Sequence, residues 1–209
     1  MSSNKSRPNQ QRGALEPQRR RGKDRVAALM EAAAAVIAER GFESATMAEI
    51  ASRAGAQIGS LYRFFPNKEV LADALAHRYG ELVRAAFGKI EERAKVLSVS
   101  DLADALLNVL FDLHGESQAM IALLEARSEW SVKRNEFRTA ALQHIARVLV
   151  LRAPHLRSET AADAAVILLY NMKMLKALTI QQGETISAGA ATELREMNRL
   201  YLARKLGDK

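Results

Sequence analysis

The segment from Gly55 to Leu71, GAQIGSLYRFFPNKEVL, places aromatic and basic side chains next to one another. Tyr62, Phe64 and Phe65 lie close together in a chain that is only 5% aromatic, and Arg63 separates the first two. A tyrosine hydroxyl donates a hydrogen bond, and a guanidinium pairs strongly with phosphate. These residue types suit a surface that packs on a core with one side and meets phosphate with the other.

Residues at the start of this segment have the chemistry to contact the edges of bases. Gln57 pairs with adenine, Ser60 bonds to either kind of base, and Ile58 packs against a thymine methyl. Gly59 lets the backbone approach a partner closely. Lys68 falls in the first turn of the next predicted helix, where the N-terminus already attracts anions. Together they predict contact with DNA, although Lys68 alone also fits a solvated surface.

Short helices must position these side chains. Apolar spacing predicts a first helix from Val26 to Arg40, which Gly41 ends. Thr46 and Glu49 form the T-x-x-E signature of a capped helix N-terminus, which predicts a short second helix. A third segment follows over residues 57–64. Two short helices joined by a glycine turn are the outline of a helix-turn-helix and also of a plain αα-corner.

The remainder of the chain is also predicted to be helical. A long helix runs from Lys68 toward Lys95, and the last two run from about Thr160 to Gln182 and from Ile186 to Leu206. No alternation typical of strands occurs, so we predict an all-α protein of about nine helices. The final helix has apolar residues at helical spacing, and the helix before it is apolar over much of its circumference. This predicts a homodimer built mainly from these two helices, with a monomeric core that both helices close as the alternative. The apolar residues of the final helix are Ile186, Ala190, Leu194, Met197 and Tyr201.

The positive charge of the chain is concentrated at its N-terminus. Of the formal net charge of +7, all but one unit lies in residues 1–25, where eight basic side chains outweigh Glu16 and Asp24. Residues 1–24 are predicted to form a disordered basic arm. We interpret the arm as a segment that seeks phosphate, with a solubilising tail as the alternative.

Composition and motifs exclude several classes of protein. The chain has no cysteine, which excludes disulfides, thiolate zinc sites and cysteine nucleophiles. Its apolar runs fall short of the roughly 20 residues that span a membrane, so we expect a cytoplasmic protein. The four histidines are scattered and no catalytic motif is present, so neither an enzyme nor a cofactor or metal is expected. A helical protein that binds acidic partners without sequence preference remains as an alternative.

Residues 25–75 resemble the DNA-binding domain of the TetR family of bacterial transcriptional regulators. The resemblance rests on ERGF at the end of the first helix and on TMAEIASRAGAQIGSLYRFFPNKEVL after it. It implies a helix-turn-helix DNA-binding domain over residues 25–70 and a helical ligand-binding and dimerisation domain over residues 71–209. Gln57 and Ile58 depart from the residue types that the family often has.

The resemblance also implies a function: a sequence-specific transcriptional regulator that binds a pseudo-palindromic DNA operator as a homodimer. The surplus of methionine and aliphatic residues predicts a small, largely apolar ligand that releases the repressor from DNA. The expected DNA contacts are Arg25, Thr46, Gln57, Ile58, Gly59, Ser60, Tyr62, Arg63 and Lys68. The candidate ligand contacts, each of which also fits core packing, are Phe111, His114, Met120, Glu125, Trp130, Phe137, Tyr170, Asn171 and Met174.

Overall fold

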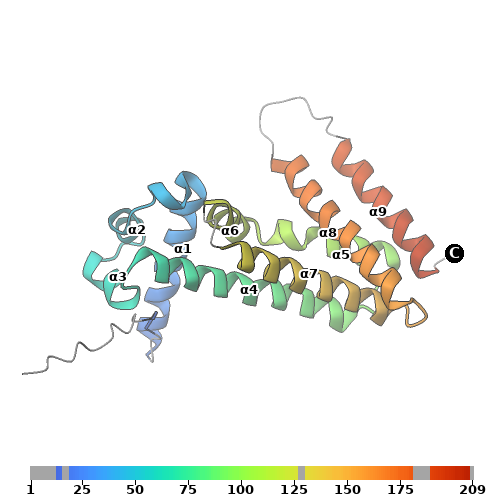
Figure 1. The fold of residues 1–209 in the computed structure, drawn as a ribbon, viewed down its shortest axis with the longest axis horizontal. Helices are drawn as coiled ribbons and strands as arrows, with labels where there is room; N and C mark the ends of the chain where they lie inside the picture. Colours follow the sequence, from blue (N-terminus) through green and yellow to red (C-terminus); the bar gives the residue numbers. More distant parts are fainter. Residues whose placement is uncertain (1–12, 16–18, 127–129, 181–188, 208–209) are drawn as a thin grey trace, which may run out of the picture. The chain divides into compact units, whose positions relative to one another are not determined.

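The computed structural model describes residues 13–15, 19–126, 130–180 and 189–207. Within those residues the regular structure is entirely helical and comprises nine helices, which confirms the predicted all-α class (Figure 1). The helices are α1 Arg20–Ser44, α2 Met47–Arg53, α3 Ile58–Phe64, α4 Lys68–Arg93, α5 Val99–Asp112, α6 His114–Ala126, α7 Ser131–Arg152, α8 Ser158–Ile180 and α9 Ala190–Leu206. None of these described helices is long and apolar enough to cross a membrane.

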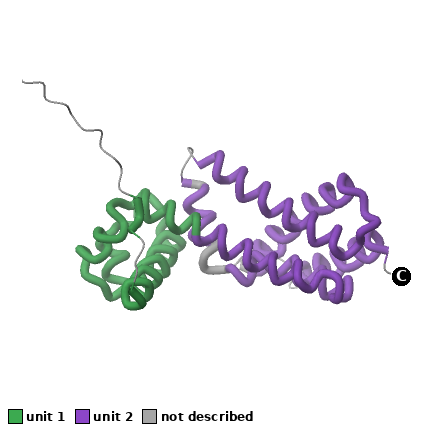
Figure 2. Tube along the Cα trace, turned by 90° about the horizontal axis from the view of Figure 1, so that it is seen from below, with its two compact units in different colours: residues 1–77 green, residues 78–209 purple. Residues whose placement is uncertain are grey.

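The chain forms two compact units, unit 1 over residues 1–77 and unit 2 over residues 78–209 (Figure 2). The division falls inside α4. Its first part therefore belongs to unit 1 and the rest of it to unit 2.

The first helix is longer than its apolar spacing predicts. α1 begins at Arg20 rather than Val26, so the last basic residues of the expected arm are helical. Most of that arm, residues 1–12 and 16–18, lies outside the described residues. Gly41 interrupts the helix as expected: its φ of 76° is left-handed, a conformation that glycine adopts without steric cost.

The core of unit 1 forms from the residues that recur at helical spacing. Leu29, Val36 and Ile37 of α1 have no solvent exposure, and neither has Ile50 of α2 or Leu61 of α3. α2 contacts both α1 and α3. Burial of large aliphatic side chains is the main force that holds these short helices, because a seven-residue helix is not stable alone.

The core of unit 2 lies around α5. This helix packs on α8 and α9, and α7 packs on α8. Leu102 and Leu106 of α5 are fully buried, together with Ile145 of α7 and Leu168 of α8. Leu202 of α9 joins the same cluster, so the described part of α9 belongs to the core of this unit.

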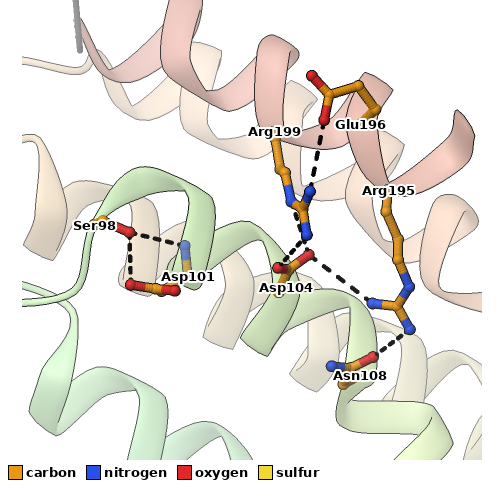
Figure 3. Close-up of polar contacts among 7 residues, drawn as sticks. All are labelled: Ser98, Asp101, Asp104, Asn108, Arg195, Glu196 and Arg199. Atoms are coloured by element: carbon orange, nitrogen blue, oxygen red, sulfur yellow. Dashed lines mark hydrogen bonds and ion pairs between the residues drawn. The ribbon is translucent and has the colours of Figure 1, made fainter. Parts of the chain in front are cut away.

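Hydrogen bonds and an ion pair connect one side of α9 to α5 (Figure 3). Arg199 donates two hydrogen bonds to the carboxylate of Asp104, at 3.2 and 2.7 Å, and Arg195 donates to Asn108 at 2.8 Å. Asp104 holds the pKa of the Arg199 guanidinium above its ordinary value. Because these arginines are four residues apart, they define one face of the helix and leave another for solvent.

The expected apolar stripe on α9 does not form a single face. Leu194 is buried and Tyr201 packs against the core, whereas Met197 is 61% exposed. Leu200, which the spacing did not select, is also exposed. Ile186 lies outside the described residues.

Candidate nucleic-acid interface and cavity

The third helix presents two chemically different faces. Leu61 and Phe64 are buried, and Phe65 directly after the helix is buried as well. The opposite side is exposed, with Tyr62 at 48% and Ile58 at 46%. The remaining predicted contacts of this region, Gln57, Gly59 and Arg63, are also exposed, and Ser60 is half-buried.

Gly55 and Gly59 leave room at this surface for different reasons. Gly55 has a φ of 58° in the turn between α2 and α3, where a residue with a side chain would be strained. Gly59 lies inside α3, and no atom lies within 4 Å of the position that a Cβ would take. The backbone of α3 is therefore open to solvent at its first turn.

Thr46 caps the N-terminus of α2. Its Oγ1 accepts a hydrogen bond from the backbone N–H of Glu49 at 3.2 Å, as the T-x-x-E signature predicts. The hydroxyl proton of an exposed threonine that accepts this bond can still be donated to a partner. Glu49 pairs with Arg40 at 3.0 Å, so the end of α1 is tied to the start of α2.

A second ion pair joins the same two helices. Arg53 donates two hydrogen bonds to the carboxylate of Glu39, at 2.5 and 2.7 Å. This bond lowers the pKa of Glu39 and raises that of Arg53. The pair is solvent-exposed, so we assign it to orientation of α2 rather than to large stabilisation.

Lys68 lies differently from the expected phosphate ligand at a helix N-terminus. Its Nζ donates to the carbonyl oxygens of Phe42, Glu43 and Ala45, at 2.8, 3.0 and 3.2 Å. It also lies 4.5 Å from the centre of the Phe42 ring. An ammonium has three N–H donors, and these contacts account for all of them. Lys68 thus holds together the turn that leads into Thr46, while the side chain of Asn67 caps α4 by accepting from the N–H of Val70.

The N-terminal segment runs beside the end of α3. The backbone N–H of Leu15 donates to the carbonyl oxygen of Phe64 at 3.0 Å. Arg25 is exposed on the first turns of α1, as are Arg20, Arg21 and Lys23. Unit 1 therefore carries basic side chains both on α1 and on the exposed side of α3.

Unit 2 contains a cavity with a volume of about 480 Å³. Helices α4 to α8 line it with mainly apolar side chains, among them Tyr79, Phe87, Met120, Leu124, Phe137 and Leu169. Its size and lining fall within the range of small-molecule sites. Phe87 stacks on His144, which hydrogen-bonds to Glu91 at 2.8 Å, so polar contacts between α4 and α7 support this wall.

The cavity gathers few of the predicted ligand contacts. Met120 and Phe137 line it. Phe111, Tyr170 and Met174 are instead exposed and are not among the described lining residues. Trp130 is buried elsewhere under Lys133, and Asn171 donates to Asn198 at 3.1 Å. The side chains of His114 and Glu125 are not among those that the structure describes.

Basic residues in the lining were not predicted. Arg134, Arg138 and Lys173 line the cavity and reach solvent, whereas Lys176 is 7% exposed. The spacing of Leu169, Met172 and Lys176 on α8 was a usable signal, because it puts a lysine at a position of the buried face.

Comparison with known proteins is informative mainly for unit 1. Residues 29–75 match the model of the tetR family of bacterial regulatory proteins. The HTH-type transcriptional repressor KstR2 of Mycobacterium tuberculosis is 33% identical over 97 residues, which are 46% of this chain and 42% of that protein. KstR2 of Rhodococcus jostii is 29% identical over 110 residues, or 52% of each. The matched part thus spans about half, or less, of these relatives.

Solved structures extend the likeness to the fold of most of the chain. A transcriptional regulator of the TerR/AcrR family from Aquifex aeolicus has a TM-score of 0.66 at 20% identity, covering 86% of this chain and 98% of that one. The fatty acid degradation regulator FadR of Bacillus halodurans has a TM-score of 0.61 at 20% identity, covering 85% and 94%. Residues 29–75, which contain the two-faced third helix, thus match the TetR family of bacterial regulatory proteins, and most of the chain has the fold of these solved regulators.

Proposed function

We propose that this chain is a sequence-specific DNA-binding regulator of transcription, a repressor that a small ligand releases from its operator. The observation that carries the proposal is the division of α3 into a buried and an exposed face. Leu61 and Phe64 fix the helix from behind, while Gln57 and Tyr62 remain in solvent. A helix held in this way can enter the major groove as a rigid element.

The exposed residues divide between base and phosphate contacts. Gln57, Ser60 and Ile58 read base edges, and Gly59 allows the backbone of α3 to come close to them. Phosphate contacts come from four exposed residues, Arg25, Thr46, Tyr62 and Arg63, and fix the position on the duplex. Lys68 supports this set by ordering the turn before Thr46, and its ammonium adds positive charge close to the bound phosphates.

We propose that the operator-binding form is a homodimer. Ile167, Tyr170 and Met174 recur at three and four residues on α8 and are each about half exposed. Met197 and Leu200 are more than half exposed on α9, on the side away from the contacts with Asp104. A second copy related by a twofold axis would cover these side chains and match a pseudo-palindromic operator. Equilibrium sedimentation tests this: I167E combined with M197E should yield monomers.

Release by a ligand follows from the cavity in unit 2. α4 supplies Tyr79, Val83 and Phe87 to the lining, and the same helix begins in unit 1. A ligand that packs against these residues can therefore act on a helix shared with the DNA-binding unit. It shifts the equilibrium only if it binds more tightly to the state with low DNA affinity.

Selection from a random double-stranded DNA library tests the proposed function. The purified chain should enrich a pseudo-palindromic sequence, and the complex should survive a large excess of unrelated DNA. A protein that binds acidic partners without sequence preference would enrich no sequence and would lose its complex to competitor. That second outcome would overturn the proposal.

A further inference from the structure

Lys176 is a cation buried in the wall of the cavity. Its side chain lines the cavity and is 7% exposed, and its Nζ has no hydrogen-bond partner among the described residues. Lysine is almost never buried to this extent unless it is paired. Leaving such a group unsatisfied opposes folding, because it loses its hydration and gains nothing in return.

The cavity is electrostatically one-sided. Arg134, Arg138 and Lys173 accompany Lys176 in the lining, and no acidic residue is among the described lining residues. Arg138 and Lys173 also approach the ring of Tyr170, at 5.9 and 5.5 Å from its centre. Positive charge therefore extends from the solvent-exposed part of the lining to the buried ammonium.

We propose that the cavity binds a small amphiphile with an apolar body and one anionic head, a carboxylate or a phosphate, which pairs with Lys176. The claim that this amphiphile is the effector rests on the proposed function. The claim that the cavity binds it rests only on the cavity and its lining. The body fits the aliphatic and aromatic walls, and the head supplies an acceptor that Lys176 does not find among the described residues.

The charge distribution sets the order of affinity for different heads. A neutral molecule of the same size leaves the Lys176 ammonium unpaired, and a cationic one adds repulsion from it and from the basic residues nearby. Burial also lowers the pKa of Lys176, which records the cost of the unpaired charge that an anion would remove.

Calorimetric titration of the full chain with matched probes tests the site. The probes are decanoate, decyl phosphate, decan-1-ol and decyltrimethylammonium, each below its micelle concentration. We expect one or both anions to bind about tenfold or more tightly than the alcohol, and the cation most weakly. The two anions distinguish a carboxylate site from a phosphate site. If no probe binds, or if the alcohol binds as tightly as both anions, the proposal is overturned.

Substitution of the buried lysine assigns the effect to one residue. K176M, which has similar length and no charge, should reduce the affinity for the preferred anion to that for the alcohol and leave the alcohol unchanged or tighter. K89M removes an exposed lysine of the same unit outside the cavity and should leave all four affinities unchanged. K176Q serves the same purpose should K176M not fold. Unchanged anion affinity in a folded Lys176 variant would overturn the proposal.

Failure of the site and failure of the proposed function give different results. DNA binding is measured separately, without probes. If anions bind through Lys176 but the chain selects no DNA sequence, the site stands and the regulatory function falls. If the chain selects an operator and the probes do not bind, the function stands and the anionic site falls.

Discussion

The exposed face of α3 and the cavity of unit 2 treat polar groups in opposite ways. Gln57 and Tyr62 keep their polar atoms in water before any partner arrives, so they cost the fold little. Lys176 holds an ammonium largely away from water, and no described residue accepts a hydrogen bond from it. In the proposed function the first surface exchanges water for DNA, whereas the second carries a cost that a ligand would remove. Substitution of an exposed residue of α3 should therefore change binding and leave stability unchanged, whereas substitution of Lys176 should change both.

The largest effect should come from the buried side of α3. L61A removes a fully buried side chain and should lower the free energy of unfolding by about 2–5 kcal/mol. Operator and unrelated DNA should be lost together, because the helix is no longer held. Chemical denaturation measures the stability. A control, I58A on the exposed side of the same helix, should leave it nearly unchanged; equal losses for both would contradict the two-faced helix.

Removal of the Lys68 ammonium should cause the next largest loss of stability. K68M leaves the carbonyl oxygens of Phe42, Glu43 and Ala45 without their donor, which should cost about 1.5–3 kcal/mol. Denaturation again reports this cost. K68R keeps a charged donor group and should recover part of it. A folded K68M protein of wild-type stability, yet with weakened DNA binding, would mean that the lysine serves phosphate alone.

In the cavity, loss of a charged side chain should raise the stability of the protein instead of lowering it. K176M removes an unpaired buried charge and should raise the free energy of unfolding by about 1–3 kcal/mol. The folded chain holds the Lys176 pKa below its ordinary value, so the unfolded chain binds more protons and wild-type stability rises with pH toward that value. The advantage of K176M should therefore shrink as pH increases. Arg134, Arg138 and Lys173 are present in both proteins, and their repulsion of the Lys176 ammonium, which only the wild type has, acts in the same direction as burial. Thermal unfolding at several pH values measures it, and a less stable K176M would be evidence that the ammonium has a partner.

The smallest effect on stability should come from the basic start of α1. Replacing Arg20, Arg21 and Lys23 by glutamine should weaken operator and unrelated DNA by similar factors. The slope of log affinity against log salt should flatten by about 0.9 for each lost phosphate contact. Replacing exposed Lys89, Arg93 and Lys95 of unit 2 in the same way is the matched control. An unaltered slope in the α1 variant would make this segment a solvated tail.

The two regions also differ in how far their sequence predicts them. Unit 1 was predictable because its sequence signals act over a few residues. Thr46 caps α2 by accepting a hydrogen bond from the N–H three positions later, and glycines mark the turns. The cavity was not predictable from the sequence, because its lining depends on which faces of five helices meet in the fold. Phe137 was found for its size, whereas Lys176 was missed because a helical lysine normally indicates solvent. The sequence predicts Lys68 as a phosphate ligand, and only the structure reveals its contacts with three carbonyl oxygens.

Gln57 tests most directly whether α3 reads the DNA sequence, because its side chain is exposed and makes no cap hydrogen bond to the helix. The measurement is the affinity of wild type and Q57A for the selected operator and for unrelated DNA, at one salt concentration. If α3 reads the base edges, Q57A should lose about 1–3 kcal/mol of binding free energy on the operator, keep its affinity for unrelated DNA and unfold like wild type. Equal losses on both DNAs, or none on either, would contradict it.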